Sequence, residues 1–409
     1  MCSTVKKRLV VIGEYFPPRL GGGRRLFEIL RKLSWKYDIR LIVIPPAYIS
    51  FIRQITTAGE KEEVILCERM VGYRIGLPRF LTLLWKKSFV LPYVLVMSYY
   101  FPVIINKLAQ LEPDLVIIDA PSPYSGLLGA LSCKILGKKY VIEYNDIQAL
   151  YAIEMLEKRI NTITENALKF VEHEIIRNGW KATAISEFVG KYAIHQHNRK
   201  DIVVITNGAD LELFDPKTNG DSVRSEFNVD AKTTLCVYTG RIEKCVGAET
   251  IIETAKLLSE RSNIKFMIVG EGDSGLTSQL SELKNVILTG LVPREQVPEY
   301  LAAADIVLVP LSDSIASHGI SPLKLFESMA MRKAVLASAV SGVKEIVTDN
   351  YDGILVSGGS EQWAQAITDL IENPSNASYL ATNALKTAQK YSWNRLAERF
   401  DELITDIGN

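Results

Sequence analysis

The segment Ser321-Pro-Leu-Lys-Leu-Phe-Glu327 combines groups that can hold a nucleoside diphosphate. Ser321 is a favoured N-cap and Pro322 a favoured first helical residue, so the sequence predicts a helix over Pro322–Met331. Free backbone N–H groups and the dipole at the start of such a helix attract phosphate. Lys324 adds a full positive charge in the first turn, and Glu327, about one turn later, can accept hydrogen bonds from ribose hydroxyls.

A second loop that could approach phosphate is the run Gly21-Gly22-Gly23, between a predicted strand at Arg8–Ile12 and a predicted helix at Arg24–Lys36. Glycines let a backbone come close to another molecule, and a helix N-terminus presents unpaired N–H groups. An ordinary strand-to-helix turn is the alternative. The run is not GxGxxG, and no acidic residue ends the second strand, so a nicotinamide-dependent dehydrogenase is disfavoured.

Alternating buried runs and amphipathic segments predict two doubly wound α/β units that position these groups. In open α/β sheets ligands bind at the carboxyl ends of the strands, so we expect the site in a cleft between the units. The predicted domains are 1–203, 204–385 and a C-terminal helix, 386–409, that crosses back to the first unit. The expected strands are Arg8–Ile12, Ile39–Ile44, Leu115–Ile118, Tyr140–Glu143, Val203–Ile205, Thr234–Tyr238, Lys265–Val269, Asn285–Leu288, Ile306–Pro310 and Ala334–Ala337.

Motifs along nearly the whole chain resemble those of the family 4 retaining glycosyltransferases. In order, they are the loop through Gly23, Asn207-Gly-Ala-Asp210 with Phe214-x-Pro216, Gly240-Arg241, Val269-Gly-Glu-Gly272, Glu327-x-Met-Ala330 and Glu345-Ile-Val347. The resemblance implies a GT-B fold, in which two Rossmann-like domains face each other across a cleft. It also implies that the C-terminal domain binds a nucleotide-sugar donor and the N-terminal domain the acceptor.

The resemblance assigns Arg241 to the donor diphosphate and Glu327 to the ribose. Arginine suits the first task because its planar, always charged fork binds phosphate oxygens bidentately. The residues expected at the donor are Gly22, Gly23, Arg241, Lys244, Glu271, His318, Ser321, Leu323, Lys324 and Glu327.

Two positions depart from the family pattern. The first Glu of a Glu-x7-Glu pair would fall at Gly319, and a frequent Lys would fall at Val246. His318 and the backbone near Gly319 are candidates for holding the sugar hydroxyls. Lys244 lies close to position 246 in the sequence but is offset by two residues. Lys324 is a candidate substitute for the missing lysine.

Asn145 and Asp146, at the end of a predicted strand, are the expected catalytic residues. The family has a polar-Asp pair near this position, so Asp146 is expected to orient the acceptor hydroxyl or the sugar; a structural N-cap is the alternative. In the family picture a donor phosphate oxygen takes the acceptor proton, so no side-chain nucleophile is required. The chain has no Asp-x-Asp motif, and its four histidines form no ligand set with carboxylates. We therefore expect no metal and no cofactor, because cations and helix N–H groups can neutralise the leaving diphosphate.

Charge distribution and one uncharged stretch suggest an anionic membrane surface as a partner. Residues 1–110 hold 18 Lys/Arg and 7 Asp/Glu, whereas residues 111–409 hold 29 and 40. The total is balanced and gives no argument for nucleic acid. Ser88–Asn106 has no charged residue, and either an interfacial helix or a buried core helix fits it, while two prolines disfavour a span. The residues expected at the membrane or acceptor are Arg79, Lys86, Lys87, Tyr99 and Tyr100.

These features predict a metal-independent glycosyltransferase of the hexosyltransferase type that acts on a membrane-associated, lipid-linked or cell-surface glycan acceptor. Five scattered cysteines without CxxC spacing indicate a reduced, cytoplasmic protein, here peripherally attached to the inner face of the membrane. One alternative is a catalytically weak or non-catalytic GT-B partner subunit, because a Glu and a Lys are missing. A nucleotide-sugar epimerase is the other alternative, although the sequence has few groups for acid–base chemistry.

Overall fold

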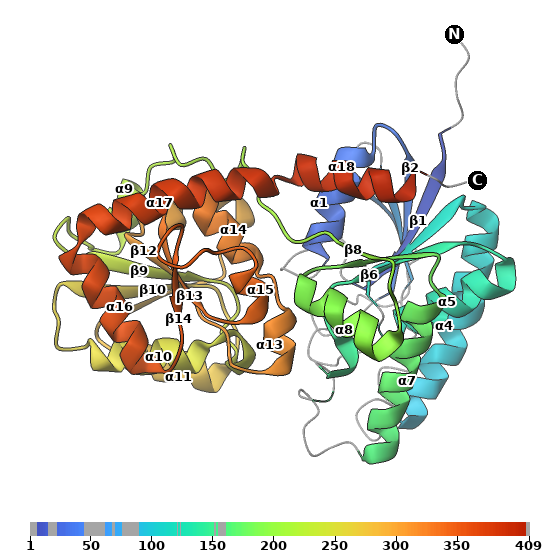
Figure 1. Cartoon of the computed structure of the whole chain (residues 1–409), viewed down its shortest axis with the longest axis horizontal. Helices are drawn as coiled ribbons and strands as arrows, with labels where there is room; N and C mark the ends of the chain where they lie inside the picture. Colours follow the sequence, from blue (N-terminus) through green and yellow to red (C-terminus); the bar gives the residue numbers. More distant parts are fainter. Residues whose placement is uncertain are drawn as a thin grey trace, which may run out of the picture. The chain divides into compact units, whose positions relative to one another are not determined.

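The computed structural model describes residues 6–14, 23–44, 62–67, 70–75, 90–120, 122, 124–150, 153 and 161–405. Internal contacts divide the chain into two compact units, which Figure 1 shows as ribbons coloured along the sequence. Unit 1 is Met1–Ile205 with Leu396–Asn409, and unit 2 is Thr206–Arg395. The sequence prediction placed these divisions after residues 203 and 385.

Unit 1 is built on an eight-stranded sheet in the order β3-β4-β2-β1-β5-β6-β7-β8. All neighbouring strands are parallel except β3 and β4, which pair antiparallel. The strands β3, β4 and β7 were not predicted from the sequence. Its elements are β1 (Arg8–Gly13), α1 (Arg24–Leu33), β2 (Asp38–Val43), β3 (Glu62–Cys67), β4 (Met70–Arg74), α4 (Val90–Leu111), β5 (Leu115–Ile118), α5 (Ser125–Leu136), β6 (Tyr140–Tyr144), α7 (Thr162–Asn178), β7 (Lys181–Ala184), α8 (Glu187–His197) and β8 (Ile202–Val204).

Unit 2 is built on a six-stranded parallel sheet in the order β11-β10-β9-β12-β13-β14. Its strands are buried runs such as those of β9 and β12, as expected for a parallel sheet that helices cover on both faces. Its elements are α9 (Asp221–Glu226), β9 (Thr234–Thr239), η2 (Lys244–Val246), α10 (Ala248–Leu257), β10 (Ile264–Val269), α11 (Ser274–Ser281), β11 (Val286–Gly290), η3 (Arg294–Gln296), α12 (Val297–Ala303), β12 (Ile306–Val309), α13 (Ile315–Gly319), α14 (Leu323–Ala330), β13 (Ala334–Ser338), α15 (Ser341–Lys344), β14 (Ile354–Val356), α16 (Ser360–Glu372), α17 (Pro374–Ala388), η4 (Gln389–Tyr391) and the start of α18 (Trp393–Ile404), whose remainder belongs to unit 1.

Each sheet reverses its strand order once. In unit 1, β2, β3 and β4 lie on one side of β1, and the chain then crosses to β5 on the other side. In unit 2, β10 and β11 lie on one side of β9, and the chain then crosses to β12 on the other side. Ligands of doubly wound folds bind at the carboxyl ends of the strands at such a switch point. Both units therefore confirm the predicted doubly wound fold class and indicate the edge of each sheet that holds a site.

The sequence predicts one long helical stretch over Glu361–Ile407, and the structure forms three α-helices there, α16, α17 and α18. Asn373 lies between α16 and α17 with φ −124° and ψ 71°, outside the helical region. The ring of Pro374 disfavours a helical conformation for the residue before it, and proline is accepted as the first residue of a new helix. A second break precedes α18, which begins in unit 2 and ends in unit 1.

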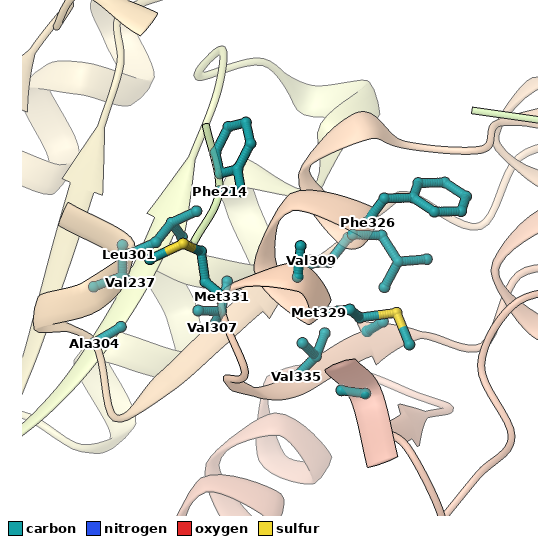
Figure 2. Close-up of a cluster of buried hydrophobic side chains, with 14 of the residues drawn as sticks. Phe214, Val237, Leu301, Ala304, Val307, Val309, Phe326, Met329, Met331 and Val335 are labelled. Atoms are coloured by element: carbon teal, nitrogen blue, oxygen red, sulfur yellow. The ribbon is translucent and has the colours of Figure 1, made fainter. Parts of the chain in front are cut away.

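The core of unit 2 fixes the position of α14 over the sheet. Leu325, Phe326 and Met329 are fully buried, and they belong to one hydrophobic cluster with Phe214 and Val335. Figure 2 shows Phe326 and Met329 projecting from the ribbon within this cluster. A helix that buries an apolar stripe cannot rotate without exposing it, so the polar side of α14 has a defined direction.

The uncharged stretch of the sequence forms most of α4. Its described residues Val96, Tyr100 and Ile104 are at most 1% exposed and pack into the core of unit 1. None of the helices in the described part of the chain is long and apolar enough to cross a membrane.

Candidate active site

Close backbone contacts hold together two loops at the carboxyl edge of the sheet in unit 2. Gly240 follows β9 with φ 133°, and Gly270 follows β10 with φ 147°. A Cβ at Gly270 would overlap the carbonyl oxygen of Gly240, so the two backbones can meet because residue 270 has no side chain. Beyond them, the N–H of Ile242 donates to the carbonyl of Glu271 at 3.0 Å. Glu271 itself is exposed on this edge.

Two of the predicted donor-binding cations lie on the first of these loops. Arg241 directly follows Gly240, is 47% exposed and forms an ion pair with Glu243 at 2.5 Å. Lys244, in η2, is 77% exposed and lies 3.4 Å from Glu249. Both cations reach solvent at the switch point of the sheet.

Lys324 reaches the same loop from α14. Its Nζ donates to the hydroxyl of Tyr238 at 2.8 Å and lies 4.0 Å from the centre of that ring. The Tyr238 hydroxyl in turn donates to the carbonyl of Arg241 at 2.6 Å. A Cβ at Gly240 would lie 3.1 Å from Nζ, so the glycine leaves room for the ammonium group. The structure thus brings Lys324 to the end of β9, next to the loop that carries Arg241.

The start of α14 corrects one detail of the sequence prediction. Pro322 is the N-cap, with φ −74° and ψ 130°, and Leu323 rather than Pro322 is the first helical residue. Ser321 is not the cap, because its hydroxyl is hydrogen-bonded to Thr206 Oγ1 at 2.7 Å, while its carbonyl accepts from the side-chain amide of Asn207. No side chain of the described residues caps this helix, and the N–H of Leu325 donates to the carbonyl of Pro322 at 3.0 Å. The dipole at the start of such a helix attracts an anion.

Glu327 is buried one turn into α14 and has a partner that the sequence did not indicate. Nη1 of Arg294 in η3 donates to Glu327 Oε1 at 2.7 Å. The side chain of Glu327 is 7% exposed and that of Arg294 is 22% exposed. The guanidinium group also lies 5.1 Å from the centre of the Phe214 ring. The guanidinium group of Arg294 therefore compensates the charge of the Glu327 carboxylate, which stays beside the predicted diphosphate site.

His318, a predicted sugar contact, has protein partners on both ring nitrogens. Nδ1 accepts from the N–H of Ser341 at 3.2 Å, so the proton of the neutral ring lies on Nε2. Nε2 lies 2.9 Å from Oδ1 of Asp313, to which it donates. The Asp313 side chain is 93% exposed and that of His318 is 30% exposed, so the carboxylate is the more accessible of the two groups.

In unit 1 the described end of the glycine loop and the strand ends form a buried polar cluster. Gly23 has φ 71° and precedes the first residue of α1. In that first turn Arg25, 4% exposed, forms an ion pair with Glu143 at the end of β6. Its Nη1 also donates to Asn145 Oδ1 at 2.9 Å, and Asn145 Nδ2 donates to Asp119 Oδ1 at 3.0 Å. Asn145 is thus held within this network, whereas Asp146 is exposed.

The cluster contains three charged groups that the sequence analysis missed: Arg25, Asp119 and Glu143. Each was visible as a polar residue at the end of a buried strand or in the turn after the glycine run. Burial raises the pKa of Asp119 well above its ordinary value, and the charge of Glu143 adds to this, against the effect of Arg25. Burial also raises the pKa of Glu14, although hydrogen bonds from Ser125 and Ser122 oppose the shift.

Asp119→Asn is expected to stabilise unit 1 at alkaline pH. A carboxyl whose pKa is raised by folding binds its proton more tightly in the folded state, so stability falls as the pH rises from about 4 through the folded-state pKa. The amide removes this penalty and keeps an acceptor for Asn145. Hydrogen exchange of the β5 and β6 amides should show a gain of at least about 1 kcal/mol at pH 8 and little at pH 4. An equal gain at both values would contradict the assignment.

The remaining predicted residues divide into two groups. Gly22, Arg79, Lys86 and Lys87 lie outside the described residues. Tyr100 is 1% exposed and packs edge-on against Tyr124 at 5.7 Å and Tyr99 at 5.2 Å, so it belongs to the core and cannot contact a membrane. This corrects the prediction for Tyr100, while Tyr99 is half-buried. Within the described ranges, no three His, Cys, Asp or Glu side chains gather as a metal site.

Comparison with known proteins matches both units. A model described as Glycosyltransferase Family 4 matches residues 65–213, and one described as Glycosyl transferases group 1 matches residues 233–373. A D-inositol 3-phosphate glycosyltransferase of Corynebacterium aurimucosum is 30% identical over 223 residues, which cover 50% of this chain and 51% of the relative. An uncharacterized glycosyltransferase of Methanocaldococcus jannaschii is 25% identical over 315 residues, 74% of this chain and 78% of the relative. The chain thus spans about half of the first relative's length.

Solved structures match over nearly the whole chain. Sucrose-phosphate synthase of Thermosynechococcus elongatus has a TM-score of 0.77 at 18% identity and covers 98% of this chain and 99% of its own. HepE of Anabaena in complex with UDP-glucose has a TM-score of 0.71 at 18% identity, covering 98% and 100%. WaaG, a glycosyltransferase of lipopolysaccharide biosynthesis, has a TM-score of 0.70 at 17% identity, covering 98% and 100%. These likenesses confirm the predicted GT-B fold.

Proposed function

Since the chain belongs to the family 4 glycosyltransferases of group 1, we propose that it transfers a sugar, with retention, from a nucleotide-sugar donor to a membrane-associated glycan or lipid-linked acceptor. One observation carries the donor part of this proposal. Lys324 Nζ, the Arg241 loop and the uncapped start of α14 lie at the switch point of a doubly wound sheet. Two cations and the positive end of a helix dipole at this place suit a diphosphate.

The same groups suit the chemistry of a leaving diphosphate. In the proposed transfer, the bond between the anomeric carbon and the phosphate oxygen breaks while the acceptor oxygen bonds to that carbon on the same face. The acceptor proton passes to a diphosphate oxygen, and Arg241 and Lys324 stabilise the charge that develops there. The exposed Asp146, with Asn145 beside it in the buried network, would orient the acceptor or the sugar. We expect transfer to persist in EDTA, since these cations can take the place of a metal.

The nucleotide can be tested first with uridine compounds. HepE has been solved with UDP and with UDP-glucose. We therefore propose to titrate the purified chain with UDP and UDP-glucose by calorimetry, with GDP and ADP in parallel and EDTA present throughout. Binding of one of them would support the donor site, and binding of none would favour a non-catalytic partner subunit. The non-catalytic alternative is supported by Gly319, which stands where the family has a carboxylate.

Lys324→Ala is expected to weaken binding of that nucleoside diphosphate by about 1.5–3 kcal/mol, the scale of a hydrogen bond to a charged group. Calorimetry measures the change directly. The control is Lys256→Ala, because that lysine forms an exposed ion pair with Glu253 on α10 and its loss should leave affinity unchanged. If Lys324→Ala binds as tightly as the native chain, Lys324 is not a donor ligand.

The membrane part of the proposal is supported by the basic first 110 residues of the sequence. At low salt the chain should sediment with vesicles of phosphatidylglycerol and phosphatidylcholine, and added salt should release it because the attraction is screened. If the chain stays in the supernatant under both conditions, the proposed peripheral attachment to the inner face of the cell membrane is wrong. The donor site would be unaffected by that result.

A further inference from the structure

Arg294 and Glu327 form a partly buried ion pair beside the proposed donor site. They are 33 residues apart, with Arg294 in η3 after β11 and Glu327 in α14. Lys324 and Glu327 are three residues apart on α14, so both project near the same side of the helix. The carboxylate partner of Arg294 is therefore carried by a residue one helical turn from Lys324, the lysine that the proposed function assigns to the diphosphate.

Only one oxygen of the Glu327 carboxylate is used by this pair. Oε1 accepts from Arg294 Nη1, and the structure gives Oε2 no hydrogen-bond partner among the described residues. The buried side-chain atoms without a hydrogen-bond partner do not include Oε2. Since Oε2 has no partner, it must be accessible to solvent. A carboxylate oxygen in this state can accept hydrogen bonds from a ligand.

Arg294 is held in place at a cost to its own hydrogen bonding. Its Nη2 is buried and has no hydrogen-bond partner among the described residues, and such an unsatisfied donor destabilises a fold. The ring of the buried Phe214 packs against the guanidinium group and limits where it can move. An unsatisfied buried group in a native fold calls for an explanation, and a role at the neighbouring site provides one.

We propose that Arg294 is a positioning residue that fixes the Glu327 carboxylate so that Oε2 meets the vicinal hydroxyls of the donor ribose. This inference rests on the proposed function, because it requires a nucleotide at this site. Arg294 compensates the charge of the buried carboxylate and holds one orientation of its plane. An acceptor that is already fixed binds a hydroxyl without a further loss of side-chain entropy. A ligand without the hydroxyl binds more weakly, because the acceptor loses its hydrogen bond to water and gains none in return.

The test compares ribose with dideoxyribose nucleotides. UDP, GDP and ADP are each titrated against the 2′,3′-dideoxy counterpart, into the native chain, Arg294→Ala and Arg294→Lys. In the native chain we expect the ribose form of the preferred nucleotide to bind about tenfold or more tightly than its counterpart. Arg294→Ala should bring this ratio close to one while changing the affinity for the dideoxy form little, and Arg294→Lys should restore part of it.

The matched control is Arg224→Ala. Arg224 also forms an ion pair in unit 2, with Asp305 at 2.5 Å, and its side chain is 18% exposed, but Asp305 precedes β12 at the opposite edge of the sheet. Its loss should lower stability without changing the ratio of affinities. A ratio in Arg294→Ala equal to that of the native chain would overturn the role of Arg294 and leave the proposed function intact. If the native chain binds no nucleotide, the proposed function fails instead.

Discussion

Arg25→Ala is expected to destabilise unit 1 by about 3–5 kcal/mol, because it leaves the carboxylate of Glu143 buried without its cation. Glu143 is 0% exposed, and its other side-chain partner in the described cluster is the hydroxyl of Thr183, at 2.7 Å. The substitution also removes the hydrogen bond from Arg25 Nε to the carbonyl of Ile205, the last residue of unit 1 before the crossing to unit 2. Hydrogen exchange of the β6 and β7 amides in the full chain measures the loss.

Two further variants separate the buried charge from other effects of the substitution. Arg25→Met combined with Glu143→Met replaces the pair by apolar side chains and should recover most of the lost stability. Arg31→Ala removes an arginine of the same helix that is 38% exposed and pairs with Glu28, and it should cost at most about 1 kcal/mol. If the double variant is as unstable as Arg25→Ala, the ion pair does not explain the effect.

Gly270→Ala is expected to destabilise unit 2 by more than about 3 kcal/mol and to abolish nucleotide binding. Its φ of 147° is a conformation that L-residues rarely adopt, and the new Cβ would overlap the Gly240 carbonyl. Relief of the overlap must separate the loops after β9 and β10, and the first of these carries Arg241. Thermal unfolding and calorimetry with the preferred nucleotide measure the two effects.

Gly290→Ala is the matched control for this second prediction. Gly290 also has a positive φ, 72°, but a Cβ there would meet no atom within 4 Å. The control carries the backbone strain without the overlap, so it should cost about 1 kcal/mol and leave nucleotide binding in place. Equal losses in the two variants would show that strain alone, rather than the meeting of the two loops, makes Gly270 necessary.

The sequence alone predicted the elements whose signals lie within a few residues. β5 has the predicted bounds, and α14 begins one residue later than predicted, because Ser321 bonds to Thr206 instead of capping the helix. Apolar runs, glycines at strand ends and a proline at a helix start act over a single turn or strand, so they can be recognised without a structure. Lys324 was predicted from the same local signals, whereas Arg241 was predicted from the resemblance to the family.

Packing decided what composition left open. The uncharged stretch fits a membrane surface and a protein core equally well, because both surround apolar side chains with apolar groups. The tertiary structure places Tyr100 in the core, where its hydroxyl donates to the carbonyl of Ile75 at 3.3 Å. An interfacial tyrosine would instead need its hydroxyl in water.

The sequence determined the doubly wound fold class, the family motifs and the chemical character of the donor site. Only the tertiary structure determined which charges are paired, since Arg25 and Glu143 are 118 residues apart and Arg294 and Glu327 are 33 apart. A buried charge is tolerated when its interaction with a partner offsets the free energy of removing it from water. The strand order and the crossings of the two sheets, rather than any local pattern, bring that partner to it.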